Sequence, residues 1–142
     1  MAKTSVWIHA VWGTKKRDRV LLSDQRAIIC RHIIQNAQEK GFYVDMVDGY
    51  LDHLHCLMIL KPGWTIAKQM QMIKGESAYW INKNKLLEQK LEWADGNFAA
   101  SVSMGKLDIV RNYILHQEAH HRKCSFEEAY AQFIASLELD EG

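Results

Sequence analysis

Four short stretches of the chain have the patterns of β-strands. In the first, Val6, Ile8, Ala10 and Trp12 alternate with Trp7, His9 and Val11, and the third contains the apolar run Leu54 to Leu60. The first stretch ends at Gly13, and the turn-forming pair Asp48-Gly49 joins the second to the third as a hairpin. Pro62-Gly63 ends the third stretch, and Asp95-Gly96-Asn97 predicts a turn before the fourth. The predicted strands are residues 5–12, 42–47, 52–60 and 98–102.

Apolar residues recur at helical spacing between and after these strands. Ser23 and Gly41 are the predicted N-cap and C-cap of the first helix, and Thr65 is the predicted N-cap of the second. A third helix is predicted from Leu107 to about His121, and the capping box at Ser125 and Glu128 opens a fourth. The predicted buried positions of the four helices are Cys30, Ile33, Ile34 and Ala37; Ile66, Met70, Ile73, Ser77 and Trp80 or Ile81; Leu107, Val110 and Ile114; and Phe126, Tyr130, Phe133 and Leu137.

The predicted element order is β-α-β-β-α-β followed by two added C-terminal helices. This order indicates an α+β fold with a ferredoxin-like or RRM-like antiparallel sheet, whose first two helices cover one face. The third helix is then placed to cover the other face. At 142 residues we expect a single domain, residues 1–142, with a core of about 4–121 and a C-terminal helix of about 125–138.

The third predicted strand carries two histidines, His53 and His55, separated by Leu54. Residues two apart on a strand share a face and lie about 7 Å apart, so both imidazoles point away from the side that holds Leu54, Cys56 and Met58. Two imidazoles on a rigid strand can bind one divalent metal ion. The alternative is that both histidines are solvated on an exposed sheet face.

Tyr113 and Gln117 are four residues apart on the third predicted helix, so their side chains share a face about 6 Å apart. A tyrosine hydroxyl beside a metal ion is a candidate nucleophile for a phosphodiester. The amide oxygen of Gln117 could complete the metal's ligands. The alternatives are a half-buried core tyrosine and a solvated glutamine.

The net charge of +1 hides a segregation along the chain. All 18 Lys and Arg residues lie at or before Lys123 with 12 of the 17 acids, which gives this part +6, whereas the last 19 residues carry −5. A basic body favours a polyanion such as nucleic acid, although the segregation could also be chance. The candidate DNA-binding residues are Lys15, Lys16, Arg17, Arg19, Lys74, Arg122 and Lys123.

Cys30, Cys56 and Cys124 are odd in number and widely spaced, as expected for reduced thiols and for no cysteine-based zinc site. The N-terminal residues include no apolar signal segment, and no apolar stretch approaches the ~20 residues that cross a bilayer. We therefore expect a cytoplasmic protein without a membrane partner.

Several sequence blocks, in order, resemble one known family from end to end. They are His9-Ala10-Val11-Trp12; Asp52-His53-Leu54-His55; Lys74-Gly75-Glu76-Ser77; Trp93, Gly96 and Phe98 leading into Ser101-Val102-Ser103; Tyr113 to Glu118; His120-His121; and Phe126-Glu127-Glu128. The chain resembles the single-tyrosine HUH transposases, which include the insertion-sequence-200-type enzymes and the REP-associated tyrosine transposases. Leu51 and His116 depart from the family pattern, which commonly has proline and asparagine there.

The resemblance implies a metal-dependent DNA transposase that acts on single-stranded DNA. His53, His55 and Gln117 would be ligands of Mg²⁺ or Mn²⁺. Tyr113 would be the catalytic nucleophile that cleaves and rejoins DNA strands through a 5′-phosphotyrosine intermediate. The implied partners are DNA hairpins near the element ends and a second copy of the chain in a homodimer, in which Gly105 could act as a hinge that carries Tyr113 to the histidines of the other chain.

Three other functions stay open. A non-catalytic RRM-like nucleic-acid-binding module would share the fold and the charge, but it gives no reason for the histidines, Tyr113 and Gln117 to converge, and the RNP aromatic motif is absent. A small hydrolase could use the two histidines with a metal-bound water. A host-retained enzyme of the same family would process repeats without moving its own gene.

Overall fold

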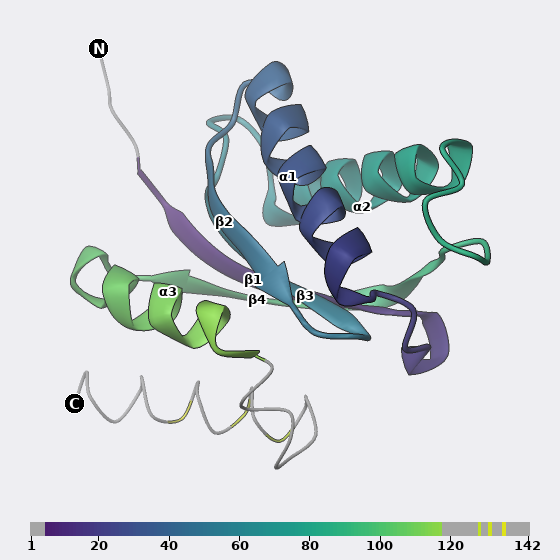
Figure 1. Ribbon diagram of the computed structural model, residues 1–142. Coiled ribbons are helices and arrows are strands. Elements are labelled where there is room, and N and C mark those ends of the chain that lie inside the picture. The colour runs from purple at the N-terminus through teal and green to yellow at the C-terminus, as the bar shows by residue number, and fades with distance from the viewer. Residues whose placement is uncertain (1–4, 118–127, 129–130, 132–134, 136–142) are drawn as a thin grey trace.

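The computed structural model describes residues 5–117 together with 128, 131 and 135 (Figure 1). Within residues 5–117 the chain forms a four-stranded sheet and three α-helices. The elements, in order, are β1 (Trp7–Thr14), the 3-10 helix η1 (Lys15–Arg17), α1 (Ser23–Lys40), β2 (Val44–Gly49), β3 (His53–Ile59), α2 (Ile66–Lys83), β4 (Trp93–Val102), the 3-10 helix η2 (Met104–Lys106) and α3 (Leu107–Leu115). The predicted fourth helix lies outside the described residues, apart from isolated positions.

The sheet is antiparallel throughout, with the strand order β2-β3-β1-β4. β1 lies at the centre, where Ala10 pairs with Cys56 of β3 on one side and with Ala99 of β4 on the other. The chain order β-α-β-β-α-β and the antiparallel pairing confirm the predicted α+β plan. The two central strands, β1 and β3, are therefore hydrogen-bonded to a neighbouring strand on each side, which makes them a rigid base for side chains.

α1 and α2 lie on one face of the sheet and α3 on the other (Figure 1). The larger core fills the first face, because alternate residues of β1 and β3, such as Trp12 and Leu54, are fully buried against α1 and α2. On the second face the apolar side of α3, made by Leu107, Val110 and Ile114, packs on Leu57 and Val102 of the sheet. α3 thus covers the sheet face on which the sequence pattern places His53 and His55, as predicted.

Helix ends agree with the sequence at two caps and differ at one. Thr65 accepts a hydrogen bond from the Lys68 amide at 3.0 Å, and Gly41 ends α1 in the left-handed conformation. Ser23, the predicted N-cap of α1, is instead its first helical residue. Leu22 occupies the cap position with extended backbone and no side-chain hydrogen bond, and its carbonyl accepts from the Arg26 amide at 2.7 Å.

The hairpin turn lies later than predicted. Asp48 and Gly49 belong to β2, and the connection to β3 is residues 50–52. A Cβ at Gly49 would collide with the backbone carbonyl of His53, so the glycine allows the two strands to approach closely and is not a turn residue.

Two other boundaries also differ. β1 continues through Gly13 to Thr14, with a shift of register against β4 after Trp12. β4 begins at Trp93, so the predicted turn at residues 95–97 is strand, and this edge strand tolerates polar residues because much of it is exposed. α3 spans Leu107–Leu115, His116 is a turn and Gln117 is again helical, and the predicted end at His121 lies outside the described residues. No helix among the described residues is long and apolar enough to cross a membrane.

Candidate active site

The buried polar side chains between the sheet and α3 form one cluster. His9 comes from β1, His53 and His55 come from β3, Tyr113 comes from α3, and Gln117 follows the end of that helix. His53 and His55 have no exposed surface, and Tyr113 is 8% exposed. The alternative of two solvated histidines is therefore wrong, and the structure brings the four site residues predicted from the sequence together on one face.

The register of the sheet explains why three histidines meet. Val11 pairs with His55 and His9 pairs with Leu57, so His9 and His55 are diagonal neighbours on the same face of adjacent strands. The sequence pattern on β3 identified His53 and His55, but it did not identify His9 as a site residue. His9 could be identified only from the pairing of β1 with β3, and local sequence periodicity does not reveal that pairing.

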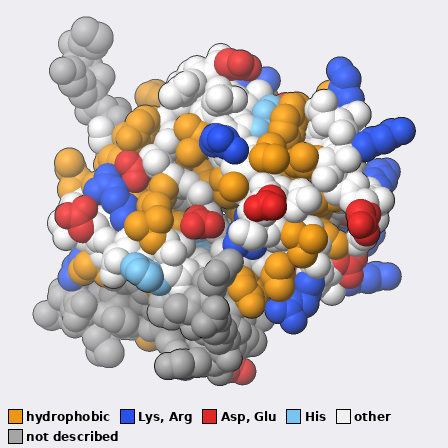
Figure 2. Space-filling model, in the orientation of Figure 1, with side chains coloured by type: hydrophobic (Ala, Val, Ile, Leu, Met, Phe, Trp, Pro, Cys, Tyr) orange, Lys and Arg blue, Asp and Glu red, His pale blue; other side chains and the backbone are white. Residues whose placement is uncertain are grey.

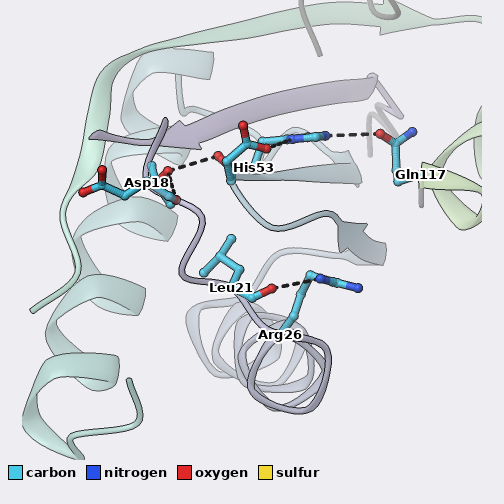
Figure 3. Close-up of polar contacts among 7 residues, drawn as sticks. Asp18, Leu21, Arg26, His53 and Gln117 are labelled. Carbon is cyan, nitrogen blue, oxygen red and sulfur yellow. Dashed lines mark hydrogen bonds and ion pairs between the residues drawn. The ribbon is translucent and has the colours of Figure 1, made fainter. Parts of the chain in front are cut away.

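His53 is held from both sides (Figure 3). Its Nδ1 lies 2.8 Å from Asp52 Oδ1, and its Nε2 lies 3.2 Å from Gln117 Oε1. The Gln117 amide is oriented by its Nε2, which donates to the Tyr113 carbonyl at 2.9 Å, so its oxygen must face His53. Because the Asp52 carboxylate can only accept, Nδ1 of His53 carries a proton.

Asp52 is kept ionised beside this histidine. Burial alone would raise its pKa, but the hydrogen bond from His53 and the positive charge of Arg17 outweigh burial, and the pKa of Asp52 lies below its usual value. Gly13 makes room for Arg17, since a Cβ at Gly13 would collide with the Arg17 guanidinium. Arg17, a predicted DNA-binding residue, thus lies close to the cluster.

His55 contacts His9 and Tyr113. His55 Nδ1 lies 2.9 Å from His9 Nε2, with the two rings stacked at 26°. The Tyr113 ring meets the edge of His55 with centroids 5.5 Å apart and approaches His9 at 6.2 Å. Burial lowers the pKa of His9 to about 4, so His9 is neutral at pH 7.

The donor set suits a divalent cation. When Nδ1–H of His53 is directed to Asp52, the lone pair at Nε2 and the oxygen of Gln117, 3.2 Å apart, are two donors that one cation could share. His55 has its Nδ1 in contact with His9, so Nε2 is the nitrogen of this ring that could bind a metal ion. Among the described residues no group of three or more His, Cys, Asp or Glu could hold a metal ion. The amide oxygen of Gln117, 3.2 Å from His53 Nε2, is a further candidate donor beside the two histidines.

Within the single chain of the structure, Tyr113 lies against His55. β4 and α3 are joined by Ser103 and the three residues of η2, and the apolar side of α3 packs on the sheet of the same chain. The expectation that α3 carries the tyrosine to a second chain stays a prediction.

The basic residues predicted to bind DNA have several environments. Lys15 pairs with Glu92 at 3.0 Å, and with Lys16 it lines a cleft of about 240 Å³. Arg19 lies over the ring of Tyr50. Lys74 donates to the Ala94 carbonyl of β4 at 2.7 Å, so this side chain also has a structural role. Figure 2 shows Lys and Arg side chains gathered on the side where α2 ends and η1 lies. Arg122 and Lys123 lie outside the described residues.

Comparisons with known proteins agree with this architecture. No curated protein matches the chain significantly. A candidate transposase from Deinococcus radiodurans R1, solved at 1.90 Å, is 22% identical, with a TM-score of 0.63 over 82% of this chain and 93% of that chain. A REP-associated tyrosine transposase bound to a REP hairpin is 17% identical, with a TM-score of 0.60 over 85% of this chain and 74% of that chain.

These two structures show the same fold. The family assignment comes from sequence: the model of the family described as IS200-like transposase matches residues 2–117, most of the chain. This protein therefore belongs to the family of IS200-like transposases.

Proposed function

We propose that this chain cleaves and rejoins single-stranded DNA with Tyr113 as the nucleophile and a divalent metal ion, Mg²⁺ or Mn²⁺, as cofactor. The observation that carries the proposal is the convergence of Tyr113 with His53, His55 and Gln117 in one buried cluster. A structural tyrosine would need no such neighbours, and an RRM-like binding module would have no use for them.

The chemistry is a transesterification. The Tyr113 oxygen forms a bond to phosphorus, the bond from phosphorus to the 3′ oxygen breaks, and the 3′ oxygen takes up a proton as the phenol loses one. The product is a 5′-phosphotyrosine and a free 3′-OH. Because the phosphodiester bond is exchanged and not hydrolysed, the reverse reaction with another 3′-OH rejoins DNA without ATP.

His53 Nε2, His55 Nε2 and Gln117 Oε1 are the atoms that would hold the metal ion. When bound, the ion would neutralise charge on the scissile phosphate and polarise its oxygens. Asp52 fixes the tautomer of His53 through Nδ1, and Gln117 is fixed by the Tyr113 carbonyl, so a ligand and the backbone of the nucleophile are linked directly.

We further propose that the substrate carries a hairpin. The structural relative that is bound to a REP hairpin supports this class of DNA, and the basic side of the molecule suits its phosphates. Two roles remain consistent with this substrate: the transposition of the chain's own element, and the processing of repeats by a host-retained enzyme.

The test is the covalent adduct. Wild-type protein should form a species that resists SDS when it is incubated with hairpin-bearing single-stranded DNA and Mn²⁺, and Tyr113→Phe should form none while it keeps DNA affinity, because only the nucleophilic oxygen is removed. Tyr79→Phe, which alters an exposed tyrosine of α2, is the matched control and should form the adduct normally. Cleavage by Tyr113→Phe would favour a hydrolase that uses a bound water.

A further inference from the structure

We propose that His9 is a positioning residue of the metal site: it holds the His55 ring so that Nε2, and not Nδ1, is the nitrogen offered to the metal ion. The inference rests on the proposed function, since it assigns a role toward the metal that His53, His55 and Gln117 are proposed to bind. His9 itself contributes no ligand in this scheme.

The contact between the two histidines is direct and shielded. His9 Nε2 and His55 Nδ1 are 2.9 Å apart, and the two residues are 1% and 0% exposed. The rings stack at 26° with centroids 5.1 Å apart, and both stand on the central strands β1 and β3. Two nitrogens at this distance share one proton, so the pair is an ordered hydrogen bond between fixed groups.

Metal binding determines where that proton must be. A neutral imidazole that binds a cation through Nε2 carries its proton on Nδ1. His55 Nδ1–H then donates to His9 Nε2, which has to be the acceptor. A flip of the His55 ring would break this hydrogen bond inside a buried site, so His9 selects a single ring orientation.

The same arrangement occurs twice in the cluster. Asp52 accepts from His53 Nδ1 at 2.8 Å, and His9 contacts His55 Nδ1 at 2.9 Å. Each proposed histidine ligand is therefore held through Nδ1 by a group that does not bind the metal. Outer partners of this kind orient metal-binding histidines, and their loss commonly weakens metal affinity about 10- to 100-fold.

His9 also touches the nucleophile. Its ring approaches Tyr113 edge to face, with centroids 6.2 Å apart. A replacement must therefore fill the same space, or the packing of α3 on the sheet changes as well. His9→Leu removes the hydrogen bond but keeps most of the volume, whereas His9→Gln restores an amide oxygen near the position of Nε2.

The experiment measures Mn²⁺ affinity by calorimetry on the full chain without DNA. His9→Leu should weaken binding about 10- to 100-fold, and His9→Gln should recover much of the loss. The matched control is His32→Gln, a histidine that pairs with Glu76 and stacks on Trp80 between α1 and α2, on the opposite face of the sheet. This control should bind Mn²⁺ like wild type.

A second readout reports on the proton itself. In the Mg²⁺-loaded wild-type protein, long-range ¹H–¹⁵N spectra should show His55 protonated at Nδ1. A His55 protonated at Nε2 overturns the inference even if His9→Leu fails to fold. If wild type binds Mn²⁺ and folded His9→Leu binds it equally well, the inference is wrong and the proposed function stands. Absence of Mn²⁺ binding by wild type rejects both the metal requirement and the role of His9.

Discussion

At the scale of single residues, Gln117 presents its amide oxygen to a nitrogen that has no proton to donate when His53 is neutral. A bound cation would relieve this contact. We expect Gln117→Ala to lower Mn²⁺ affinity about tenfold and His55→Ala to lower it by at least the same factor. Changes around metal sites commonly weaken metal affinity by this amount. Isothermal titration of each variant measures the effect.

Gln69→Ala is the matched control for that experiment. Gln69 is a fully buried glutamine of α2 whose amide donates to the Ile59 carbonyl and whose oxygen accepts from the Lys61 amide. Its removal should lower stability without changing metal affinity. Equal Mn²⁺ affinities for Gln117→Ala, His55→Ala and wild type would show that the buried cluster is not the metal site.

The residues of this cluster differ in how far the sequence could reveal them. His53 and His55 share a strand face and Tyr113 and Gln117 share a helix face, so local periodicity already paired them. His9 meets His55 only through the register of β1 against β3, and that register depends on packing between distant segments. Burial of both histidines likewise depends on the docking of α3, which periodicity alone does not fix.

At the scale of elements, α3 is anchored to the sheet by Arg111. Its guanidinium donates to both carboxylate oxygens of Asp45 on β2, at 2.8 and 3.2 Å, and lies over the ring of Trp7 on β1. It also donates to Asp108 within the helix at 2.9 Å, where the carboxylate is 97% exposed. The pairing with Asp45 therefore holds the helix that carries Tyr113 against the strands that carry the histidines.

We expect Asp45→Asn to increase amide hydrogen exchange in residues 107–115 about 2- to 5-fold, the range typical of a partly exposed ion pair. The covalent adduct should form more slowly in this variant, because Tyr113 would be held less firmly. Asp108→Asn removes only the contact within the helix and serves as the control. If both variants exchange at the same rate, the ion pair between α3 and β2 does not anchor the helix.

The order of the elements could be predicted from sequence, and several of their ends could not. Gly49 resembled a turn residue in sequence because glycine serves both turns and close strand contacts, and only the neighbouring backbone of His53 distinguishes the two. β4 begins at Trp93 because an exposed edge strand accepts polar residues, which removes the alternation that would mark it. Polar segments of this kind are assigned by pairing with β1 and not by their own pattern.

At the scale of the whole molecule, the structure completes the candidate site within one chain. Tyr113 lies 5.5 Å from His55 between ring centroids, and the short η2 connection leaves α3 on its own sheet. A homodimer remains a prediction, and whether it shares its sites is a separate question. Complementation between two inactive variants distinguishes sites within a chain from sites between chains.

Tyr113→Phe lacks the nucleophile and His55→Ala lacks a proposed ligand. If sites form within one chain, every site in a mixed population lacks one of the two, so mixing should yield no adduct with DNA and Mn²⁺. If sites form between chains, a mixed dimer has one intact site and the adduct appears on the His55→Ala chain. Subunit exchange must be verified with differently tagged chains, and a double variant with both changes provides the background. Because α3 packs on its own sheet, we expect no adduct above that background; a clear adduct on the His55→Ala chain would show that α3 exchanges between chains in solution.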